Sequence, residues 1–204
     1  MYQNIVFDVD GTLLDSDQAI LISLHKVLLE ELGREFSAEE LTPVLGMPTK
    51  KSLKLLEVPD VDRADARLLQ YLKEHNDLMT LYSGITDMLE KLVEDNIHIG
   101  IVTSKTREEF QVDFIPLGIH HYFSHIICAD DTAKHKPEPD PLLKYVEQTG
   151  INPATTLYVG DTVYDQKCAN GAGIDFALAL WGAKQPESTE AQHRLSMPED
   201  ILKI

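Results

Sequence analysis

Short apolar runs alternate along most of the chain with segments in which apolar residues recur every three or four positions. The first run, Ile5 to Phe7, is followed by similar runs at 97–102, 125–129, 156–159 and 176–180. Helical spacing occupies residues 84–94, 107–117, 141–148 and a segment that ends at Ala169. This pattern predicts five strands that alternate with helices. Such alternation is typical of α/β proteins with a doubly wound, Rossmann-like parallel sheet, which helices cover on both faces.

The segment from residue 16 to residue 80 breaks the alternation because it contains only helical patterns. Its helical signals are the apolar spacing over 16–33, a capping box at Ser37 and Glu40, and further helical patterns over 50–56 and 60–79. We therefore expect an all-helical cap, residues 16–80, inserted into a core made by residues 1–15 and 81–204. The tail from Gln185 onward is expected to add a helix and a short closing segment.

The charge balance of the chain argues against a nucleic-acid partner. The 204 residues include 18 Lys and Arg against 34 Asp and Glu, which gives a net charge of −16, and no basic run is present. Hydrophobic residues make up 43% of the chain, so a packed core is expected. An acidic protein that acts on an anionic substrate needs a bound cation or local basic groups, and we expect the cation.

Nothing in the sequence indicates a membrane segment or an oxidising compartment. No apolar stretch approaches about 18 residues, and the chain runs into its first strand without a basic, then apolar, leader. The two cysteines, Cys128 and Cys168, lack metal-ligand spacing and are expected to be buried thiols. We therefore expect a cytoplasmic protein without membrane contact, as a monomer or weak homodimer.

Two aspartates follow the first predicted strand in the sequence DVDGT. Asp8 and Asp10 share a face because side chains alternate along a strand, and Gly11 and Thr12 complete the turn. Two carboxylates that close repel each other unless a cation or a proton lies between them. On its own the motif is also explained by a simple turn, in which Asp bonds its own backbone and Gly adopts a positive φ.

Three other polar clusters follow predicted strands or the loops after them. They are Thr103 with Ser104, Lys136 in the sequence KPEPD, and Asp161 with Asp165 in GDTVYD. The carboxyl ends of parallel strands lie at one edge of a sheet, so these clusters and DVDGT should converge on one pocket. Asp8, Asp10, Asp161 and Asp165 are hard oxygen ligands that suit Mg²⁺, whereas the hydroxyls and the lysine suit phosphoryl oxygens. The set predicts a phosphoryl-transfer site.

In this order and spacing, the four clusters resemble the haloacid dehalogenase superfamily, in its phosphoglycolate phosphatase and β-phosphoglucomutase-like branch with a helical cap. The resemblance covers nearly the whole chain. It implies that Asp8 is the nucleophile, which forms an aspartyl-phosphate, and that Asp10 is the general acid and base. It also implies a Mg²⁺ site made by Asp8, the backbone carbonyl of Asp10, Asp161 and, directly or through water, Asp165.

The same resemblance assigns the phosphate-binding groups. Thr103 would hold the phosphate through its hydroxyl, with the backbone N–H of Ser104, and Gly11 and Thr12 belong to the same phosphate-binding turn. Lys136 would join the nucleophile to the phosphoryl group. Lys134 and Ser104 are the rivals of Lys136 and Thr103. The family pattern places the lysine directly before Pro, and Thr103 follows the apolar run directly.

Several other residues invite a functional interpretation. Lys105 is most simply a solvated residue at the start of the next helix. Residues 46–50 form the cap loop expected to face the site, and Lys50 either meets a second anionic group of the substrate or is solvated. A histidine metal site is disfavoured because the spacing of His120, His121, His125 and His135 does not place three on one face. Trp181 is assigned to packing, and Tyr164 is left open.

The expected function is a Mg²⁺-dependent phosphatase that hydrolyses a small phosphate monoester, with a small phosphorylated metabolite as its partner. Within the superfamily, an acid at Asp10 excludes dehalogenation. A sugar phosphomutase shares all four clusters and stays open, although DGT rather than DGV favours hydrolysis. A receiver-type signalling domain is disfavoured because its acceptor Asp would not follow the first strand. The sequence does not name the substrate.

Overall fold

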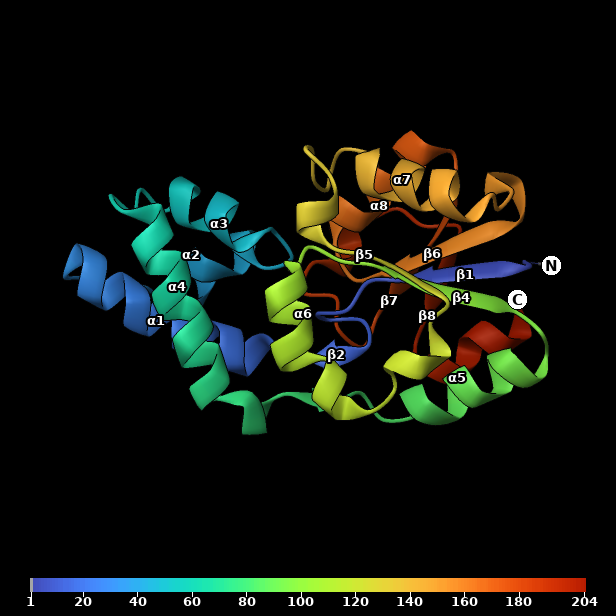
Figure 1. The fold of residues 1–204 in the computed structure, drawn as a ribbon, viewed down its shortest axis with the longest axis horizontal. Coiled ribbons are helices and arrows are strands. Elements are labelled where there is room, and N and C mark those ends of the chain that lie inside the picture. Colours follow the sequence, from blue (N-terminus) through green and yellow to red (C-terminus); the bar gives the residue numbers. More distant parts are fainter. Residues whose placement is uncertain (1) are drawn as a thin grey trace.

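The computed structural model describes residues 2–204, which form a six-stranded parallel sheet beside a group of helices (Figure 1). The strand order is β5-β4-β1-β6-β7-β8, so the first strand of the chain is one of the two central strands. The bounds are β1 Asn4–Phe7, β4 His98–Val102, β5 His125–Ile127, β6 Thr156–Gly160, β7 Asp175–Ala179 and β8 His193–Leu195. This arrangement confirms the predicted doubly wound α/β fold.

The register of the central strands sets the position of the site. Phe7 of β1 lies opposite Ile101 of β4 and Val159 of β6, and all four residues of β1 are buried. Strands buried on both faces read as continuous apolar runs, which is why 5–7 carries no polar residue. Because the strands are parallel and in register, Asp8, Thr103 and Asp161 all follow the same edge of the sheet.

Four helices and the C-terminal turns cover the two faces of the sheet. The bounds are α5 Ile85–Glu94, α6 Arg107–Asp113, α7 Asp140–Thr149 and α8 Val163–Ala172. Ile5 and Phe7 of β1 belong to the cluster that includes α5, α6 and Ile201, whereas Val6 belongs to the cluster with α7 and α8. Figure 1 shows α7 and α8 on one side of the strands and α5 on the other. The alternation along β1 therefore divides the core into two layers.

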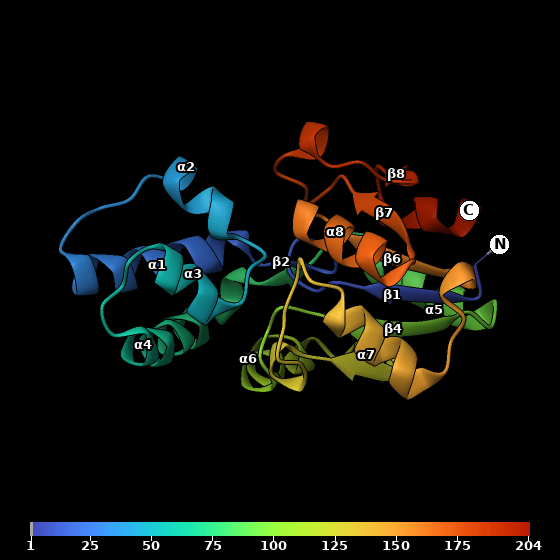
Figure 2. The ribbon, with the colours of Figure 1, turned by 90° about the horizontal axis from the view of Figure 1, so that it is seen from above.

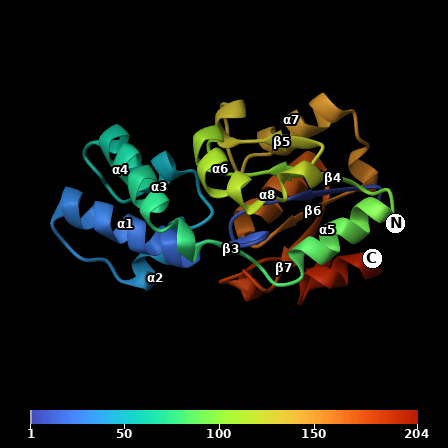
Figure 3. The same cartoon turned by 60° about the horizontal axis from the view of Figure 1, so that its bottom comes forward.

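The helices between residues 16 and 80 lie beyond the carboxyl ends of the strands, to one side of the sheet (Figure 2). Their bounds are α1 Asp17–Leu32, α2 Ala38–Leu41, α3 Thr49–Leu55 and α4 Val61–Glu74. The chain enters and leaves this group through a two-stranded antiparallel ribbon, β2 Leu14–Asp15 and β3 Thr80–Leu81, and Figure 3 shows β3 between the group and the sheet.

The structure differs from the sequence-based expectations mainly in very short elements. The sixth strand, β8, comes from the tail, where a helix was expected, and 3₁₀ turns at 186–188 and 198–203 flank it. β8 spans three residues with one buried side chain, and β2 and β3 have two residues each. Runs this short carry no periodicity, because backbone pairing with neighbours rather than an apolar face creates them. Both cysteines are free and buried, as expected.

The described helices are all too short or too polar to cross a lipid bilayer.

Candidate active site

Asp8 and Lys136 form a buried ion pair directly beyond the central strand. Lys136 Nζ lies 2.9 Å from Asp8 Oδ1, and the exposed fractions of the two residues are 2% and 3%. The same Oδ1 accepts a hydrogen bond from the Val9 backbone N–H at 2.8 Å. None of the described residues donates to the other carboxylate oxygen of Asp8, so this oxygen is open to a ligand.

Asp165, at the first turn of α8, holds Lys136 from the other side. Its Oδ1 lies 2.8 Å from Lys136 Nζ and accepts a hydrogen bond from the Tyr158 hydroxyl at 3.2 Å. Its Oδ2 accepts from the backbone N–H and the hydroxyl of Thr162, at 3.0 and 2.5 Å. The Tyr158 hydroxyl has a single proton and lies nearer the Val102 carbonyl, at 2.8 Å. Lys136 and Thr162 are thus the main donors to Asp165, one on each of its oxygens. Asp165 therefore orients Lys136, and it reaches a metal only if these donors move.

Asp161 lies at the end of β6, against the DVDGT turn. Thr12 donates a long hydrogen bond from its hydroxyl to Asp161 Oδ1, at 3.4 Å. Gly11 has φ +72°, and a Cβ at this position would collide with the Asp161 carboxylate. Only glycine fits both requirements, since other residues rarely adopt this φ and would fill the space next to Asp161. The turn is thus fitted to an acidic partner from β6.

Burial and mutual repulsion disfavour the charged forms of two of these acids. Burial raises the pKa of Asp8 to about 7, although Lys136 opposes the change. Burial, together with Asp165 and Asp8, raises the pKa of Asp161 well above its ordinary range. Burial also disfavours ionised Asp165, but Lys136 and Thr162 outweigh it and hold its pKa below the ordinary value. Asp8 and Asp161 therefore lie close together without enough positive charge nearby to stabilise both ionised forms.

This acidic group has the composition of a Mg²⁺ site. One oxygen from each of Asp8, Asp161 and Asp165 lies within 4.8 Å of the others. Carboxylate oxygens with few protein donors are the ligands that Mg²⁺ prefers, and a cation there would offset the repulsion that raises the pKa of Asp8 and Asp161. Asp8 and Asp161 fit this role best, because the oxygens of Asp165 are already occupied.

Asp10 is held by two side chains that the sequence analysis did not assign. Its Oδ1 accepts a hydrogen bond from the Ser16 hydroxyl at 2.5 Å and lies 3.1 Å from Lys105 Nζ. The expectation that Lys105 is solvated is wrong: its exposed fraction is 6%, and it also pairs with buried Asp113 at 2.7 Å. Despite burial, these acids raise the pKa of Lys105, so it stays charged. The sequence analysis missed these contacts because no periodic pattern in the sequence relates Lys105 to Asp113 or to Asp10.

Thr103 and Ser104 follow β4, on the strand next to β1. Thr103 is buried, and its hydroxyl accepts a hydrogen bond from the Lys105 N–H at 3.2 Å. Ser104 is partly exposed and donates its hydroxyl to the backbone carbonyl of Gly46 at 3.0 Å. Ser104 thus connects the sheet edge to the helical segment, a contact that the sequence does not indicate.

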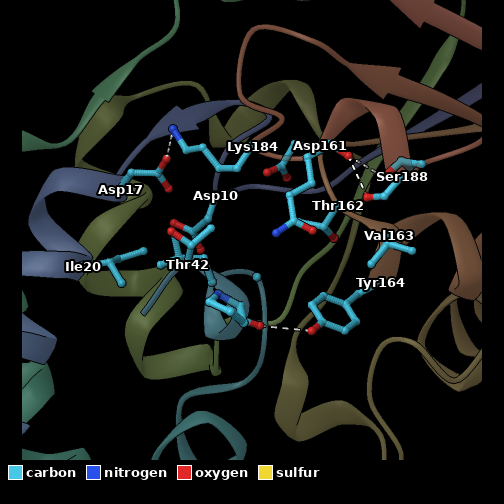
Figure 4. A pocket seen from close by; sticks show the side chains of 15 residues that line it. Asp10, Asp17, Ile20, Thr42, Asp161, Thr162, Val163, Tyr164, Lys184 and Ser188 are labelled. Atoms are coloured by element: carbon cyan, nitrogen blue, oxygen red, sulfur yellow. Dashed lines mark hydrogen bonds and ion pairs between the residues drawn. The ribbon is translucent and has the colours of Figure 1, made fainter. Parts of the chain in front are cut away.

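Two adjoining cavities lie between the sheet edge and the helical segment. The larger holds about 130 Å³ and is lined by Asp10, Asp161, Tyr164 and Lys184 (Figure 4). The helical segment adds Thr42, Pro43, Leu45 and Gly46 to this lining. The smaller holds about 60 Å³ and is lined by Asp8, Asp10, Lys105 and apolar residues from α1, α4 and the loop at 44–47. Asp10 lines both cavities, and the space suits a small substrate.

Polar contacts cross between the helical segment and the sheet around these cavities. Tyr164 donates its hydroxyl to the Pro43 carbonyl at 3.1 Å, and Lys184 pairs with Asp17 at 2.5 Å (Figure 4). Lys184 is one of the residues of the larger cavity that the sequence analysis missed, because the loop after β7 carries no motif. Trp181, in the same loop, donates its indole N–H to the Thr12 carbonyl at 2.8 Å and packs against the core, in agreement with its assignment to packing.

The remaining candidates lie away from the cavities. Lys50 is exposed, pairs with Asp62 at 2.7 Å and lines neither cavity. Lys134 is exposed as well, so Lys136 is the lysine that reaches Asp8. Within residues 2–204, no group of three nearby metal-binding side chains includes a histidine.

Comparisons with known proteins agree with this geometry. Residues 5–179 match the family of haloacid dehalogenase-like hydrolases. A phosphoglycolate phosphatase from Aquifex aeolicus is 32% identical, over 98% of this chain and 95% of that protein. The pyrophosphatase PpaX from Oceanobacillus iheyensis is 30% identical, over 99% of this chain and 94% of that protein. A crystal structure from Lactobacillus plantarum, provisionally assigned as a phosphoglycolate phosphatase, has a TM-score of 0.92 at 33% identity, over 100% and 99% of the two chains.

Proposed function

The chain belongs to the haloacid dehalogenase-like hydrolase family, and on this basis we propose that it is a Mg²⁺-dependent phosphatase for a small phosphorylated metabolite. The observation that carries the proposal is the set of Asp8, Lys136 and Asp161 at the sheet edge, the first two buried and the third partly buried, with Asp10 beside it. These residues combine a carboxylate open on one oxygen, a fixed cation and a second acid at the cavity. Relatives with this architecture carry phosphatase names.

In the proposed reaction Asp8 attacks the phosphorus atom of the substrate. The bond from phosphorus to the leaving-group oxygen breaks, its electron pair stays on that oxygen, and Asp10 donates a proton to it. A water molecule then gives a proton to Asp10 and attacks the phosphorus of the aspartyl-phosphate, which releases phosphate and restores Asp8. One carboxyl thus acts as an acid in the first step and as a base in the second.

The other residues bind and orient the phosphoryl group. Lys136, held between Asp8 and Asp165, offsets repulsion between the nucleophile and the phosphoryl oxygens. The Thr103 hydroxyl and the Ser104 N–H are donors for these oxygens. Asp8 and Asp161, with the backbone carbonyl of Asp10, would hold Mg²⁺, which supplies positive charge for the phosphoryl oxygens when it is bound. Asp165 supports the site through Lys136.

We also propose that residues 16–80 form a cap that closes over the site. The support for this division is the narrow entry through β2 and β3 and the small number of polar contacts that cross the cavities. Closure would exclude bulk water from the reacting phosphoryl group and bring residues 42–47 against the leaving group.

The lining of the larger cavity favours phosphoglycolate over pyrophosphate as the substrate. Lys184 is its one lysine and it already pairs with Asp17, while Asp10 and Asp161 are further acids of the lining. The leaving group of phosphoglycolate carries a single carboxylate, whereas that of pyrophosphate is a second phosphoryl group with more negative charge. Similarity to PpaX pyrophosphatases makes pyrophosphate the second candidate.

The decisive experiment measures phosphate release from phosphoglycolate and from pyrophosphate with purified protein. We expect a higher kcat/KM for phosphoglycolate in the presence of Mg²⁺ and loss of both activities with EDTA, restored by added Mg²⁺. Turnover that persists with EDTA would overturn the metal-dependent mechanism. A higher kcat/KM for pyrophosphate would replace the preferred substrate while keeping the chemistry.

The same assay separates hydrolysis from phosphoryl transfer between positions of a sugar. A phosphomutase shares the four clusters, and it would convert a hexose 1-phosphate into the 6-phosphate without stoichiometric release of phosphate. We expect free phosphate as the product. The receiver-type alternative has no remaining support, because the chain belongs to a hydrolase family and Asp8 and Asp10 follow β1, the first strand of the chain.

A further inference from the structure

A buried lysine and a buried aspartate form a chain of charges that leads away from the cavity. Lys105 Nζ lies 3.1 Å from Asp10 Oδ1 and 2.7 Å from Asp113 Oδ2. The exposed fractions of Lys105 and Asp113 are 6% and 0%. Asp113 Oδ1 is buried and has no hydrogen-bond partner among the described residues. The reaction scheme above assigns no task to either residue.

The charge of Lys105 is not needed to hold the loop that carries it. The Lys105 backbone N–H donates to the Thr103 hydroxyl at 3.2 Å, and its carbonyl accepts from the Ala129 N–H at 2.8 Å. The backbone at residue 105 is therefore fixed without its side chain. A buried ion pair gains little stability over an apolar pair of similar volume, because the desolvation of both charges offsets their attraction. An orphaned carboxylate oxygen on Asp113 adds to that cost.

The contacts of Asp10 indicate what the charges do. Lys105 and the Ser16 hydroxyl both bind Oδ1, and none of the residues in 2–204 donates to Oδ2. Asp10 lines both cavities, so the oxygen without a protein donor is the one available to the leaving group. Ser16 is the residue directly before α1 and lies in the segment proposed to move. Lys105, by contrast, comes from the edge of the sheet, so its contact does not depend on the helices.

We propose that Lys105, fixed by Asp113, is a positioning residue that holds one oxygen of Asp10 and thereby aims the other at the leaving-group oxygen. The proposal rests on the proposed phosphatase function. It predicts that loss of Lys105 impairs proton donation to the leaving group more than it impairs attack on phosphorus.

The test compares substrates whose leaving groups differ in their need for a proton. An alkoxide is a poor leaving group and requires an aimed acid, whereas nitrophenolate departs without one. For Lys105→Met we expect kcat/KM to fall about 100-fold with phosphoglycolate or glycerol phosphate, a typical loss for misplaced acid catalysis. With p-nitrophenyl phosphate we expect a fall of less than about 5-fold. A purely structural role would lower both values alike.

Three further variants complete the design. Lys105→Arg keeps the charge and should recover much of the activity on alkyl phosphates. Asp113→Asn releases Lys105 without removing it and should show the same selective loss to a smaller degree, which keeps the test open if Lys105→Met does not fold. Lys134→Met, an exposed lysine outside the cavities, should leave both kcat/KM values unchanged.

Equal losses on alkyl and aryl phosphates in the folded Lys105 and Asp113 variants, or no loss in either, would overturn the positioning role. Failure of the proposed function itself would look different, because the unmodified protein would then turn over neither class of ester.

Discussion

In the half of the site that belongs to the sheet, three of the four charged side chains are buried and bound to one another, whereas in the half that faces the helices the charged side chains are partly exposed and sparsely bound. The sheet half comprises Asp8, Lys136, Asp161 and Asp165, and Lys136 has two carboxylate partners within 2.9 Å. The cap-facing half comprises Asp17, Tyr164, Lys184 and the loop at 42–47. Single contacts join its two sides, such as Tyr164 to the Pro43 carbonyl.

This difference suggests a division of labour between the two halves. Buried groups on adjacent strand ends are held within tenths of an ångström, which the transfer of a phosphoryl group requires. The partly exposed contacts between the helices and the sheet edge cost little to break, and only a two-stranded ribbon joins the two parts. The cap-facing half is therefore able to open for the substrate. Changes in the sheet half should therefore abolish the reaction, and changes in the cap-facing half should alter it by modest factors.

The largest expected effect is that of Asp8→Asn. The amide is not a nucleophile, so we expect kcat to fall by about 10⁴-fold or more. Burial raises the pKa of Asp8 to about 7, so at pH 8 its charge is unfavourable in the metal-free protein, and the neutral amide removes this cost. We therefore expect the Tm of the metal-free variant at pH 8, measured by circular dichroism, to be equal to or higher than that of the unmodified protein.

The matched control for this variant is Asp95→Asn, an exposed acid after α5 that pairs with Lys91 at 3.3 Å. It should leave kcat unchanged. Activity retained by Asp8→Asn would remove Asp8 as the nucleophile, and a collapsed Tm would show that the carboxylate is instead needed for folding.

The sequence predicted the sheet half because its determinants are local. Each acid, hydroxyl or lysine follows an apolar strand or a loop after one, and parallel strands bring such positions to one edge whatever their distance along the chain. The sequence analysis assigned Asp165 to the Mg²⁺ site, directly or through water, but did not indicate the donors that make it a partner of Lys136. Those donors are Lys136 in the loop before α7, Tyr158 within β6 and Thr162 directly before α8, and no spacing rule specifies that arrangement.

A smaller effect is expected from Gly46→Ala in the cap-facing half. Gly46 has φ +77°, and a Cβ there would lie 2.9 Å from Thr162 Cγ2, at the sheet edge. Because Thr162 donates to Asp165, it cannot move freely, and the loop must withdraw from the cavity instead. We expect a loss of about 1 kcal/mol in stability from the left-handed backbone and a fall of about 10-fold in kcat/KM.

Gly33→Ala separates the backbone strain from the contact with the sheet edge. Gly33 follows α1 with φ +68°, and a Cβ there would meet nothing within 4 Å. Its denaturant midpoint should fall about as much as that of Gly46→Ala, while its kcat/KM stays unchanged. Equal kinetic losses in both variants would mean that stability alone, and not closure against Thr162, explains the effect.

Two lysines outside the four motifs were predicted less well, because long-range pairing decides where their side chains lie. Lys105 follows Ser104 in an exposed-looking sequence, and only its pairing with Asp113 and Asp10 makes it a buried residue. Lys50 lies next to the loop expected to face the site, but α4 supplies Asp62 and draws its side chain away. The charge on a side chain gives no information about which of several acids it will meet.

The smallest effects are expected from Lys184→Ala and Lys50→Ala, and their contrast tests the assignment of the cap-facing half. Lys184 lines the larger cavity beside Asp10 and Asp161, and its partner Asp17 has an exposed side-chain fraction of 18%. A partly exposed charge of this kind contributes about 1 kcal/mol to the free energy of substrate binding. Lys184→Ala should therefore raise the KM for phosphoglycolate about 5-fold with little change in kcat.

Lys50→Ala removes a lysine of the same charge that points at Asp62 on α4, and its KM should change less than about 2-fold, since exposed ion pairs contribute little. Saturation kinetics with phosphoglycolate and with p-nitrophenyl phosphate, which lacks the carboxylate, separate the possibilities. If Lys184 meets the second anionic group, only the phosphoglycolate KM rises. A rise with Lys50→Ala instead would mean that α3 turns toward the site when the substrate is bound, and that the cap rearranges internally and does not move as one piece.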